Sequence, residues 1–532
     1  MRVLLINPFY PISETPSPPL GLAYLAAALQ QADIEVKILD LVVFPYRQGM
    51  LQDLLEGFNP RIVGITAVTM TVDKAMEVIR DVKKINGGIV TVMGGPHVTF
   101  CARQTLAEHP GLDVAVLGEG ERSLVELARA VKKGDDLSRI KGIVYRRQAD
   151  ICFTEKRPLI ENLDKLPVPA RDLLPLGRYR ALSMPISMTT SRGCPFKCIF
   201  CVGRKMVGSR VRYRNPRAVV DELEYLSTLD FHQINIADDL FTAKRSHCLA
   251  VCEEILRRRL QVTWTSFARV DTVSDEVLTA MKAAGCSAVS FGIESANPQI
   301  LKTIKKGITL DQVVAAVTMC AAAGITPFAS FILGLPGETP QTIKETMDFA
   351  QRLKGLGLGY GFHLLAPFPG TEVREKSEQY EIKILTDDWS QYHANRAIVE
   401  TLTVNRQMMD DIVIAWEDEY NQLLADIKKR IPLKKATPAE IQELENLERI
   451  VMIYDLMIKG VIEEKGTWQN ANLPTSRTDA LAGLVRRIGE NAEIDKEALA
   501  ATLRDAVARG HLCFREEGGH VQWAWTNFIK PV

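Results

Sequence analysis

The sequence predicts an α/β protein with two successive parallel sheets, followed by a mainly helical C-terminal region. Apolar, strand-like runs alternate with helical patterns through residues 1–140 and again through residues 186–380. Near-continuous apolar strands separated by helices indicate parallel sheets that are covered on both faces. Residues 141–185 are expected to form a linker between the two sheets, and residues 381–532 the helical region.

The composition excludes several classes of protein. The 532 residues are 46% hydrophobic and 24% charged, as in ordinary globular proteins. Lys+Arg and Asp+Glu both number 65, so the basic surplus of a nucleic-acid binder is missing. No run predicts a transmembrane helix, and the N-terminus reads as a strand rather than a signal peptide. Outside one group of three, most of the cysteines are scattered singly, which favours a reducing compartment and a cytoplasmic protein.

Five strands are expected in the N-terminal part, at residues 3–7, 36–40, 62–66, 89–93 and 114–118. This pattern is typical of a doubly wound, Rossmann-like (flavodoxin-like) domain, which binds ligands beyond the carboxyl ends of its strands. Glycines and small hydroxyl residues there let a large planar or phosphate-bearing ligand approach the backbone. No G-x-G-x-x-G follows the first strand, which disfavours a nicotinamide dinucleotide. The candidate contacts are Asn7, Pro8, Thr66, Thr69, Met70, Thr71, Gly94, Gly95, His97, Gly118, Glu119 and Gly120.

The linker begins with alternating runs at residues 143–147 and 151–154, which predict a small hairpin. Pro158, Pro167 and Pro169 then disfavour helix and predict an extended strap.

The middle part is expected to be a (β/α)6 partial TIM barrel. Its strands are predicted at residues 186–190, 233–237, 262–267, 288–292, 327–333 and 361–366. Its helices are predicted at residues 216–229, 244–259, 275–284, 310–323 and 340–353. Asn215, Ser274 and Thr339 are N-cap residue types, and Gly285 and Gly324 close two of the helices. In barrels of this kind the chemistry lies at the carboxyl ends of the strands.

Three cysteines, Cys194, Cys198 and Cys201, follow the first barrel strand in a C-x-x-x-C-x-x-C pattern. Three thiolates on one loop can hold three irons of a [4Fe–4S] cluster and leave the fourth iron open to a ligand. A zinc site is the first alternative, although it needs a fourth ligand that no nearby Cys or His supplies. Three buried structural cysteines are the second. Cys248 and Cys252 fall within a predicted helix and are interpreted as core thiols.

The cysteine loop, with Phe200 before its last cysteine, and the groups at the other strand ends resemble the radical S-adenosylmethionine (SAM) superfamily. The resemblance implies that the open iron binds the amino and carboxylate groups of SAM. It implies SAM contacts at Phe200, Asp238, Asp239, Arg269, Glu294, Gly334 and Pro336. Asp238 and Asp239 replace the Gly-Gly-Glu of many relatives, so the residue that binds the SAM amino group stays open.

The N-terminal part resembles the cobalamin-binding domain that precedes the barrel in many radical SAM enzymes. The resemblance lies in residues 18–26 (PPLGLAYLA), 66–71 (TAVTMT), 94–97 (GGPH) and 118–121 (GEGE), and in the LDKLPVP strap. It implies a bound cobalamin. The D-x-H-x-x-G motif that supplies a histidine to cobalt is missing, so we expect no histidine lower ligand and interpret His97 as a polar contact. The alternative is a docking module without a cofactor.

The C-terminal region begins a strong helix at the capping box Thr437–Glu440 and ends in a helix and a hairpin at 512–515 and 521–526. This order is similar to a winged helix, but the region is not basic. We expect a helical cap that covers the barrel mouth and helps to select the substrate.

The resemblance implies an enzyme that cleaves SAM to a 5′-deoxyadenosyl radical and then methylates an unactivated carbon from methylcobalamin. The first alternative is an oxidative cyclase of the anaerobic Mg-protoporphyrin ester cyclase type, which residues 214–222 also resemble. A non-catalytic cobalamin or cluster carrier is the second alternative, and a methylthiotransferase is disfavoured because residues 1–140 contain only Cys101. The substrate would be a small molecule, lipid, tetrapyrrole or peptide, and the reductant a flavodoxin or ferredoxin.

Overall fold

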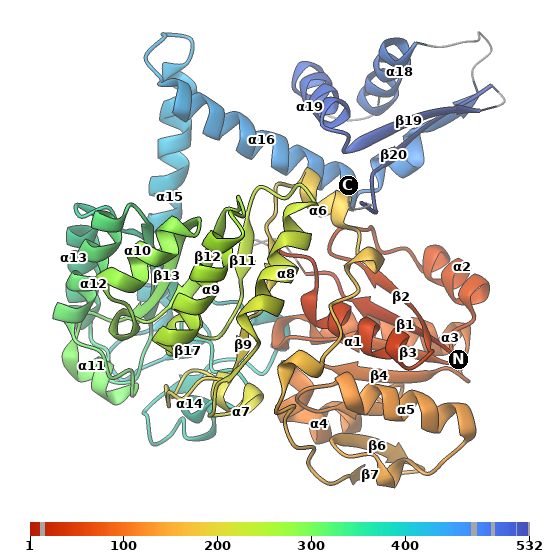
Figure 1. Ribbon diagram of the computed structural model, residues 1–532, viewed down its shortest axis with the longest axis horizontal. Coiled ribbons are helices and arrows are strands. Elements are labelled where there is room, and N and C mark those ends of the chain that lie inside the picture. Colours follow the sequence, from red (N-terminus) through yellow and green to blue (C-terminus); the bar gives the residue numbers. More distant parts are fainter. Residues whose placement is uncertain (11–15, 470–475, 491–494, 518, 530–532) are drawn as a thin grey trace.

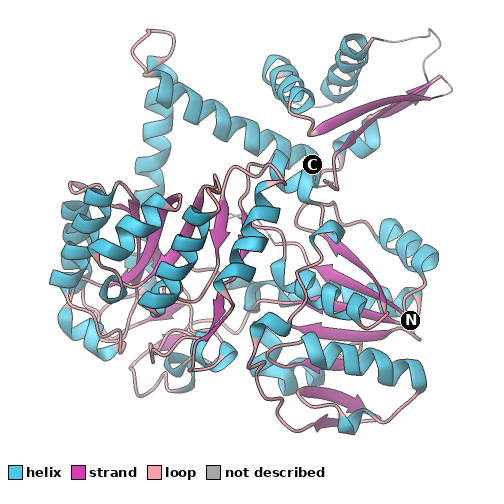
Figure 2. Cartoon of the chain, in the orientation of Figure 1, coloured by secondary structure: helices cyan, strands magenta, loops and turns pink. Residues whose placement is uncertain are grey.

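The computed structural model describes residues 1–10, 16–469, 476–490, 495–517 and 519–529. Two α/β units lie side by side, the N-terminal one in red to orange and the barrel in yellow to green (Figure 1). The blue C-terminal helices and strands lie above both units, and Figure 2 shows the two sheets as separate groups of strands. Among the described residues, none of the helices has the length and apolar character needed to span a membrane.

The N-terminal sheet has the order β2-β1-β3-β4-β5-β6-β7, and its first five strands are parallel. The strands are β1 (Arg2–Asn7), β2 (Glu35–Asp40), β3 (Ile62–Thr66), β4 (Val90–Gly94), β5 (Val114–Val116), β6 (Ile143–Arg147) and β7 (Asp150–Phe153). The helices are α1 (Leu20–Gln31), α2 (Gln48–Phe58), α3 (Val72–Ile85), α4 (Pro96–Glu108) and α5 (Glu121–Lys133). Alternate residues of β1 enter separate cores: Leu4 and Ile6 on one face, Val3 and Leu5 on the other.

The hairpin predicted in the linker forms as β6 and β7, but it belongs to this sheet. β6 pairs antiparallel with β5, and its residues Val144 and Tyr145 are buried in the cores on the two faces. The first sheet therefore extends to Phe153 rather than ending near residue 140, because β6 completes both of its cores.

The second sheet is the predicted partial barrel, with six parallel strands in the order β15-β14-β13-β12-β11-β8. The strands are β8 (Ile186–Met188), β11 (Ile234–Ile236), β12 (Trp264–Ala268), β13 (Cys286–Glu294), β14 (Thr326–Leu333) and β15 (Gly359–Leu364). The covering helices are α8 (Pro216–Ser227), α9 (Arg245–Arg257), α10 (Asp275–Ala283), α11 (Pro298–Thr303), α12 (Leu310–Ala323) and α13 (Pro340–Lys354). Asn215, Ser274 and Thr339 cap their helices as predicted.

Short elements connect these units. They are α6 (Leu176–Ala181), β9 (Ser191–Arg192), α7 (Gly203–Val207), β10 (Arg212–Tyr213), α14 (Glu372–Glu375), β16 (Lys383–Ile384) and β17 (Val399–Glu400).

The C-terminal region contains α15 (Arg406–Arg430), α16 (Pro438–Ile458), α17 (Val461–Lys465), β18 (Thr467–Gln469), α18 (Arg477–Gly489), α19 (Lys496–Ala508), β19 (Leu512–Glu517) and β20 (His520–Trp525). The capping box of α16 and the hairpin β19–β20 form as predicted, and β18 pairs with β20.

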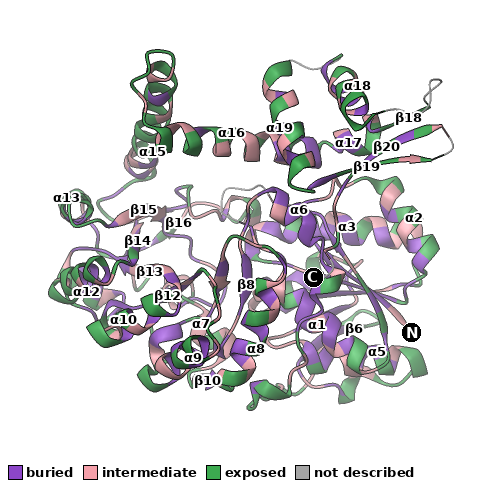
Figure 3. Cartoon of the chain, turned by 45° about the horizontal axis from the view of Figure 1, so that its top comes forward, coloured by how far each residue is buried: buried purple, intermediate pink, exposed green. Residues whose placement is uncertain are grey.

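Most of the described part of this region does not cover the barrel mouth, contrary to our expectation. Its apolar residues, such as Leu456 and Trp525, pack with Val43 and Leu182 and against Phe231, which precedes β11. This contact lies at the amino ends of the barrel strands (Figure 3). Among its described residues, the first part reaches the carboxyl ends: Thr403 Oγ1 donates to the carbonyl of Glu338 at 2.9 Å. The apolar face of α16 needs an apolar partner, and α6 supplies one.

Candidate cluster and cofactor site

The three cysteines lie on the loop between β9 and α7, and all three line one cavity of about 270 Å³. They are free thiols that are exposed or partly exposed, so they are not three buried structural cysteines. Gly203 N donates to Cys201 Sγ at 3.3 Å, the kind of contact that tunes iron–sulfur clusters. No three His, Cys, Asp or Glu side chains of the described residues converge on a single-metal site. A cubane cluster binds its thiolates on separate irons and does not need such convergence. Cys248 and Cys252 are buried, as predicted.

Asp238, at the end of β11, anchors the start of this loop. Its carboxylate accepts hydrogen bonds from Thr190 N at 2.6 Å and Thr190 Oγ1 at 2.6 Å, and from Ser191 N at 3.1 Å and Ser191 Oγ at 2.7 Å. Burial raises the pKa of Asp238, and these four donors oppose that rise. Both carboxylate oxygens are thus bonded to protein donors, so Asp238 positions the loop.

The neighbouring Asp239 is exposed, and its carboxylate accepts one backbone hydrogen bond, from Gly193 N at 3.1 Å. It therefore lies beside the cysteine loop on the solvent side, where a ligand of the loop can reach it.

Arg269 and Glu294, at the ends of β12 and β13, are both buried and paired. Arg269 forms a bidentate ion pair with Asp271, with both bonds 2.9 Å, and its guanidinium lies 3.5 Å from the ring centroid of Phe196 on the cysteine loop. Glu294 Oε1 accepts from Lys306 Nζ at 2.7 Å. The end of β12 thus supports the cysteine loop directly.

The sequence interpretation missed Lys306. It follows the short helix α11 rather than a strand, so no strand-end pattern marks it. Its ammonium lies 5.9 Å from the ring centroid of Phe200. Partial burial raises the pKa of the Cys198 thiol, and the charges of Lys306 and Arg269 act in the opposite direction. Lys306 is therefore a buried cation next to the candidate cluster ligands.

The Glu294–Lys306 pair occupies the space that a side chain at position 292 would take. Glu294 has a φ of +71°, and the pairing of β13 with β14 shifts register between Gly292 and Glu294. A Cβ at Gly292 would clash with the carboxylate Oε1 of Glu294. A side chain at position 292 would therefore displace the Glu294–Lys306 pair from its present place.

We therefore expect Gly292→Ala to destabilise the protein by about 1–3 kcal/mol, the usual cost of forcing extra volume into a packed site. The urea midpoint of unfolding measures the effect. Gly57→Ala is the matched control, because Gly57 lies in α2 with nothing within 4 Å of a new Cβ. Equal midpoints for the two variants would contradict the role assigned to Gly292.

The loop after β14 is held closed by Glu338, whose Oε2 accepts from Gly334 N at 2.6 Å and Leu335 N at 3.1 Å. Burial raises the pKa of Glu338 to about 8 despite these amide donors. A Cβ at Gly334 would lie 2.8 Å from Met409 Sδ, and Pro336 is buried. The side of Gly334 from which a side chain would project is therefore covered by Met409.

At the carboxyl ends of the N-terminal strands, an apolar cavity of about 80 Å³ lies between the sheet and helices α1 and α5. Five of the predicted cobalamin residues line it together with Leu5, Leu22, Leu25 and Leu124: Thr66, Gly94, Gly95, Gly118 and Gly120. Gly95 has a φ of +101°, and a Cβ there would lie 2.6 Å from the carbonyl oxygen of Ala67. This close approach explains the glycine.

The other predicted contacts lie around this cavity. Asn7 is buried and donates to Asp40 Oδ1 at 2.9 Å, Pro8 is buried, and Met70 is half-buried. Residues Thr69–Thr71 form a 3-10 helix that packs against Trp389–Gln391. These last residues close the N-terminal site toward the barrel.

His97 lies under Trp389, with 5.3 Å between the ring centroids in an edge-on arrangement. Burial, together with the charges of His109 and Arg374, lowers the pKa of His97 to about 4, so the imidazole is neutral near pH 7. Its Nδ1 has no hydrogen-bond partner among the described residues.

Glu119 lies at the interface with the barrel. Its Oε1 accepts from Arg192 Nη1 at 3.0 Å and Arg212 Nη1 at 2.9 Å, and its Oε2 accepts from Ile160 N at 2.7 Å. Arg192 also bonds Glu121 Oε1 at 2.8 Å. Burial opposes the charge of Arg192, but Glu121 and Glu119 outweigh it and raise the pKa of the guanidinium. This interdomain ion-pair cluster (Glu119, Glu121, Arg192 and Arg212) joins the cysteine loop to the N-terminal domain.

Sequence models of two known families match this chain. The sequence model of the radical SAM superfamily matches residues 188–350, and that of the B12 binding domain matches residues 13–128. The fold and the cysteine loop define a radical SAM enzyme. More particularly, the chain belongs to the cobalamin-binding radical SAM family, and its cofactors are a [4Fe–4S] cluster, SAM and cobalamin.

Three relatives illustrate the family. An uncharacterized methyltransferase of Pyrococcus horikoshii is 38% identical over 74% of this chain and 86% of its own length. The anaerobic magnesium-protoporphyrin IX monomethyl ester cyclase of Rubrivivax gelatinosus is 34% identical over 66% of each chain. The solved structure of the cobalamin-dependent S-adenosylmethionine radical enzyme OxsB has a TM-score of 0.68 at 18% identity, over 95% of this chain and 80% of that chain. The last likeness shows the fold.

Proposed function

We propose that this enzyme is a C-methyltransferase that transfers a methyl group to an unactivated carbon of its substrate. The interdomain ion-pair cluster carries the proposal, because it ties the Gly118–Gly120 turn of the cobalamin cavity to the loop of Cys194. The 38% identical relative, described as a methyltransferase, supports the same activity.

The residues of the site would have separate roles. Cys194, Cys198 and Cys201 would hold the cluster, and the exposed Asp239 would accept a hydrogen bond from the SAM amino group. When bound, the three cofactors supply a carbon-centred radical and a methyl group. The Arg269–Asp271 pair packs against Phe196 and keeps the cysteine loop in place. The Glu294–Lys306 pair holds the positive charge of Lys306 near Cys198.

The apolar cavity admits only a small part of a corrin-sized molecule, so the macrocycle would lie outside it, over the strand ends. We propose that cobalt has no histidine lower ligand. The neutral His97 is packed edge-on against Trp389, which favours a structural contact over ligation.

Oxidative cyclisation is the second candidate, favoured by the Rubrivivax gelatinosus relative. Residues 214–222, which resemble that group, have a structural explanation here. Glu222 is buried between Arg171 at 2.6 Å and Arg214 at 2.5 Å. This segment therefore does not distinguish the two reactions.

The test uses SAM labelled in its methyl group, the reconstituted enzyme with cobalamin, and candidate substrates of the lipid, tetrapyrrole, peptide and small-molecule classes under reducing, anaerobic conditions. We expect 5′-deoxyadenosine and a labelled product from the wild-type enzyme, and neither from Cys198→Ala. Cys513→Ala is the matched control, because this free, exposed thiol lies in β19. A modified product without label would establish cyclisation or rearrangement and overturn methyl transfer.

A further inference from the structure

The turn that follows α11 is bonded directly to the cysteine loop. The amide of Ile199 donates to the carbonyl oxygen of Ile304 at 3.2 Å. Cys198 Sγ lies 3.9 Å from the carbonyl oxygen of Lys305, and Lys306 is the next residue along the chain. These contacts hold the turn, and with it Lys306, beside a candidate cluster ligand.

Lys306 brings a buried positive charge to this place. Its side chain and that of its partner Glu294 are each 7% exposed, and the bond between them is 2.7 Å long. The ammonium carries three donors, but among the residues that the structure describes it bonds Glu294 Oε1 alone. Burial raises the pKa of the Cys198 thiol, and Lys306 lowers it by more than Glu294 raises it. The positive end of the pair therefore acts more strongly on the cysteine loop.

Both aromatic residues of the cysteine loop face a buried cation. The ammonium of Lys306 lies 5.9 Å from the ring centroid of Phe200. The guanidinium of Arg269 lies 3.5 Å from the ring centroid of Phe196, and its Nη2 donates to the carbonyl oxygen of Lys306 at 2.8 Å. Asp271, the partner of Arg269, is 20% exposed, so solvent screens that pair more than it screens the pair of Lys306.

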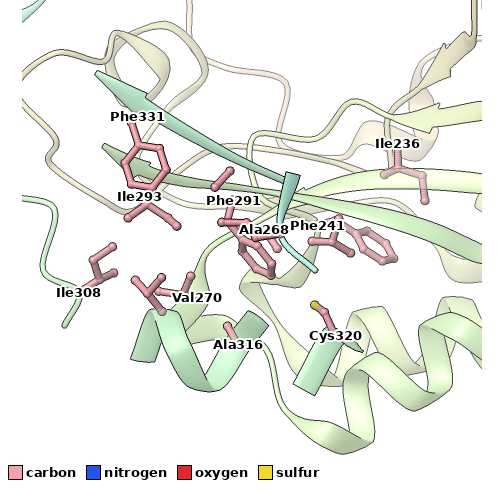
Figure 4. Packing of buried hydrophobic residues seen from close by; sticks show 14 of the residues in the cluster. Ile236, Phe241, Ala268, Val270, Phe291, Ile293, Ile308, Ala316, Cys320 and Phe331 are labelled. Atoms are coloured by element: carbon pink, nitrogen blue, oxygen red, sulfur yellow. The ribbon is translucent and has the colours of Figure 1, made fainter. Parts of the chain in front are cut away.

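The hydrophobic core fixes the positions of these charges. Val270, Ile293 and Ile308 each lie within two residues of one of the charged side chains, and all three belong to one core (Figure 4). Such a core is close-packed and has a low local dielectric constant, which strengthens electrostatic interactions. A charge held at its edge therefore acts on neighbouring groups with little screening.

Stability does not account for a lysine in this position. Burying two charges costs desolvation that their attraction roughly offsets, and apolar residues of similar size would stabilise the fold at least as well. A nearby charge does matter to an iron–sulfur cluster, because net charge, hydrogen bonds to the sulfurs and solvent exposure set its reduction potential. A buried cation favours the reduced cluster, which carries one more negative charge.

We infer that Lys306 raises the reduction potential of the [4Fe–4S] cluster and so helps it to accept the electron that SAM cleavage requires. In this step one electron passes from an external one-electron donor to the cluster, no bond forms or breaks, and no proton moves. Lys306 stabilises the added charge from the side of the cysteine loop, and Glu294 opposes it in part. The inference concerns electron uptake and does not depend on methyl transfer.

A redox titration of the reconstituted full chain without SAM tests the inference, with the EPR signal of the reduced cluster as the readout. A unit charge about 10 Å away changes an equilibrium constant roughly tenfold at an effective dielectric constant of about 20. We therefore expect Lys306→Met to lower the ratio of reduced to oxidised cluster about tenfold at a fixed potential, a shift of about 59 mV for one electron. Lys306→Arg, which keeps the charge, should stay near the wild type, and Glu294→Gln should shift the potential upward.

Lys305→Met is the matched control. Lys305 is adjacent in the sequence but 45% exposed, and it pairs with Glu372 in solvent. Because exposed charges are screened, we expect its loss to change the ratio by less than about twofold. Iron content and circular dichroism establish that each variant is folded and loaded. The double variant Lys306→Met/Glu294→Gln leaves no buried charge unpaired, so it replaces any single variant that loses its cluster, and its potential should still be below that of the wild type.

Equal potentials in the wild type and in loaded Lys306→Met or the double variant would overturn the inference. A lowered potential in both Lys306→Met and Glu294→Gln would do the same, because loosened packing has one direction whereas opposite charges have opposite effects. Equilibrium SAM binding is measured on the same proteins. Weaker SAM binding by Lys306→Met at an unchanged potential would assign Lys306 to SAM binding instead and would likewise overturn the inference.

Discussion

Replacement of Asp238 by alanine is expected to destabilise the protein by roughly 2–6 kcal/mol. The carboxylate is buried and accepts from the backbone N–H groups and hydroxyls of Thr190 and Ser191. The hydroxyls can rotate toward other acceptors, but the two amides cannot, and each buried donor left without an acceptor costs about 1–3 kcal/mol. Because these residues begin the cysteine loop, the iron content after reconstitution should fall as well.

Asp239→Ala is the natural control for this variant. The two aspartates are adjacent, but Asp239 is exposed and has a single backbone donor, Gly193 N. We expect its loss to cost no more than about 1.5 kcal/mol of unfolding free energy and to weaken SAM binding instead. Urea unfolding and equilibrium SAM binding separate the two roles. If Asp238→Ala unfolds at the same urea concentration as Asp239→Ala, Asp238 is not the anchor of the loop.

The alternation of strands and helices was predictable from the sequence because it depends on local patterns. All six barrel strands and the three predicted N-caps formed as expected, since periodicity and capping act within a few residues. The residues at the strand ends were also predictable as a group.

The partners of those residues were not predictable. Glu119 was interpreted as a cofactor contact, yet it bonds Arg192 and Arg212, which follow it by 73 and 93 positions. Lys306 has no local pattern and is recognisable only from its contact with Glu294. Pairing across domains depends on how the units dock, which no short-range pattern contains.

The position of the C-terminal region was not predictable for the same reason. The helical pattern of α16 predicts an apolar face but not the surface that covers it. Arg178 of α6 joins the C-terminal region to the N-terminal domain, because it donates to the carbonyl of Val43 at 2.8 Å and to Asn527 Oδ1 at 2.6 Å. These contacts hold the C-terminal region away from the barrel mouth.

The interdomain ion-pair cluster gives the second large prediction. Glu119→Ala leaves the guanidinium of Arg212, buried and no longer neutralised, at the domain interface. Removing one partner of a buried pair typically costs about 3–5 kcal/mol, and we expect a loss of that size in the free energy of unfolding. Arg192 keeps its ion pair with Glu121, so its charge stays neutralised, unlike that of Arg212. The amide of Ile160 loses its acceptor, and its hydrogen exchange should become faster.

Glu126→Ala is the matched control, because Glu126 of α5 pairs with Arg157 of the linker but is 44% exposed. Exposed pairs contribute at most about 1 kcal/mol. Glu119→Gln, which keeps an acceptor but removes the charge, should fall between the two in urea unfolding. Arg192 precedes Cys194 by two residues, so loss of the interdomain ion pairs should loosen the contact between the two cofactor sites. We therefore also expect less methyl transfer for each SAM that is cleaved. Unchanged transfer in a folded Glu119→Ala enzyme would show that the ion pairs stabilise the fold without aligning its two sites.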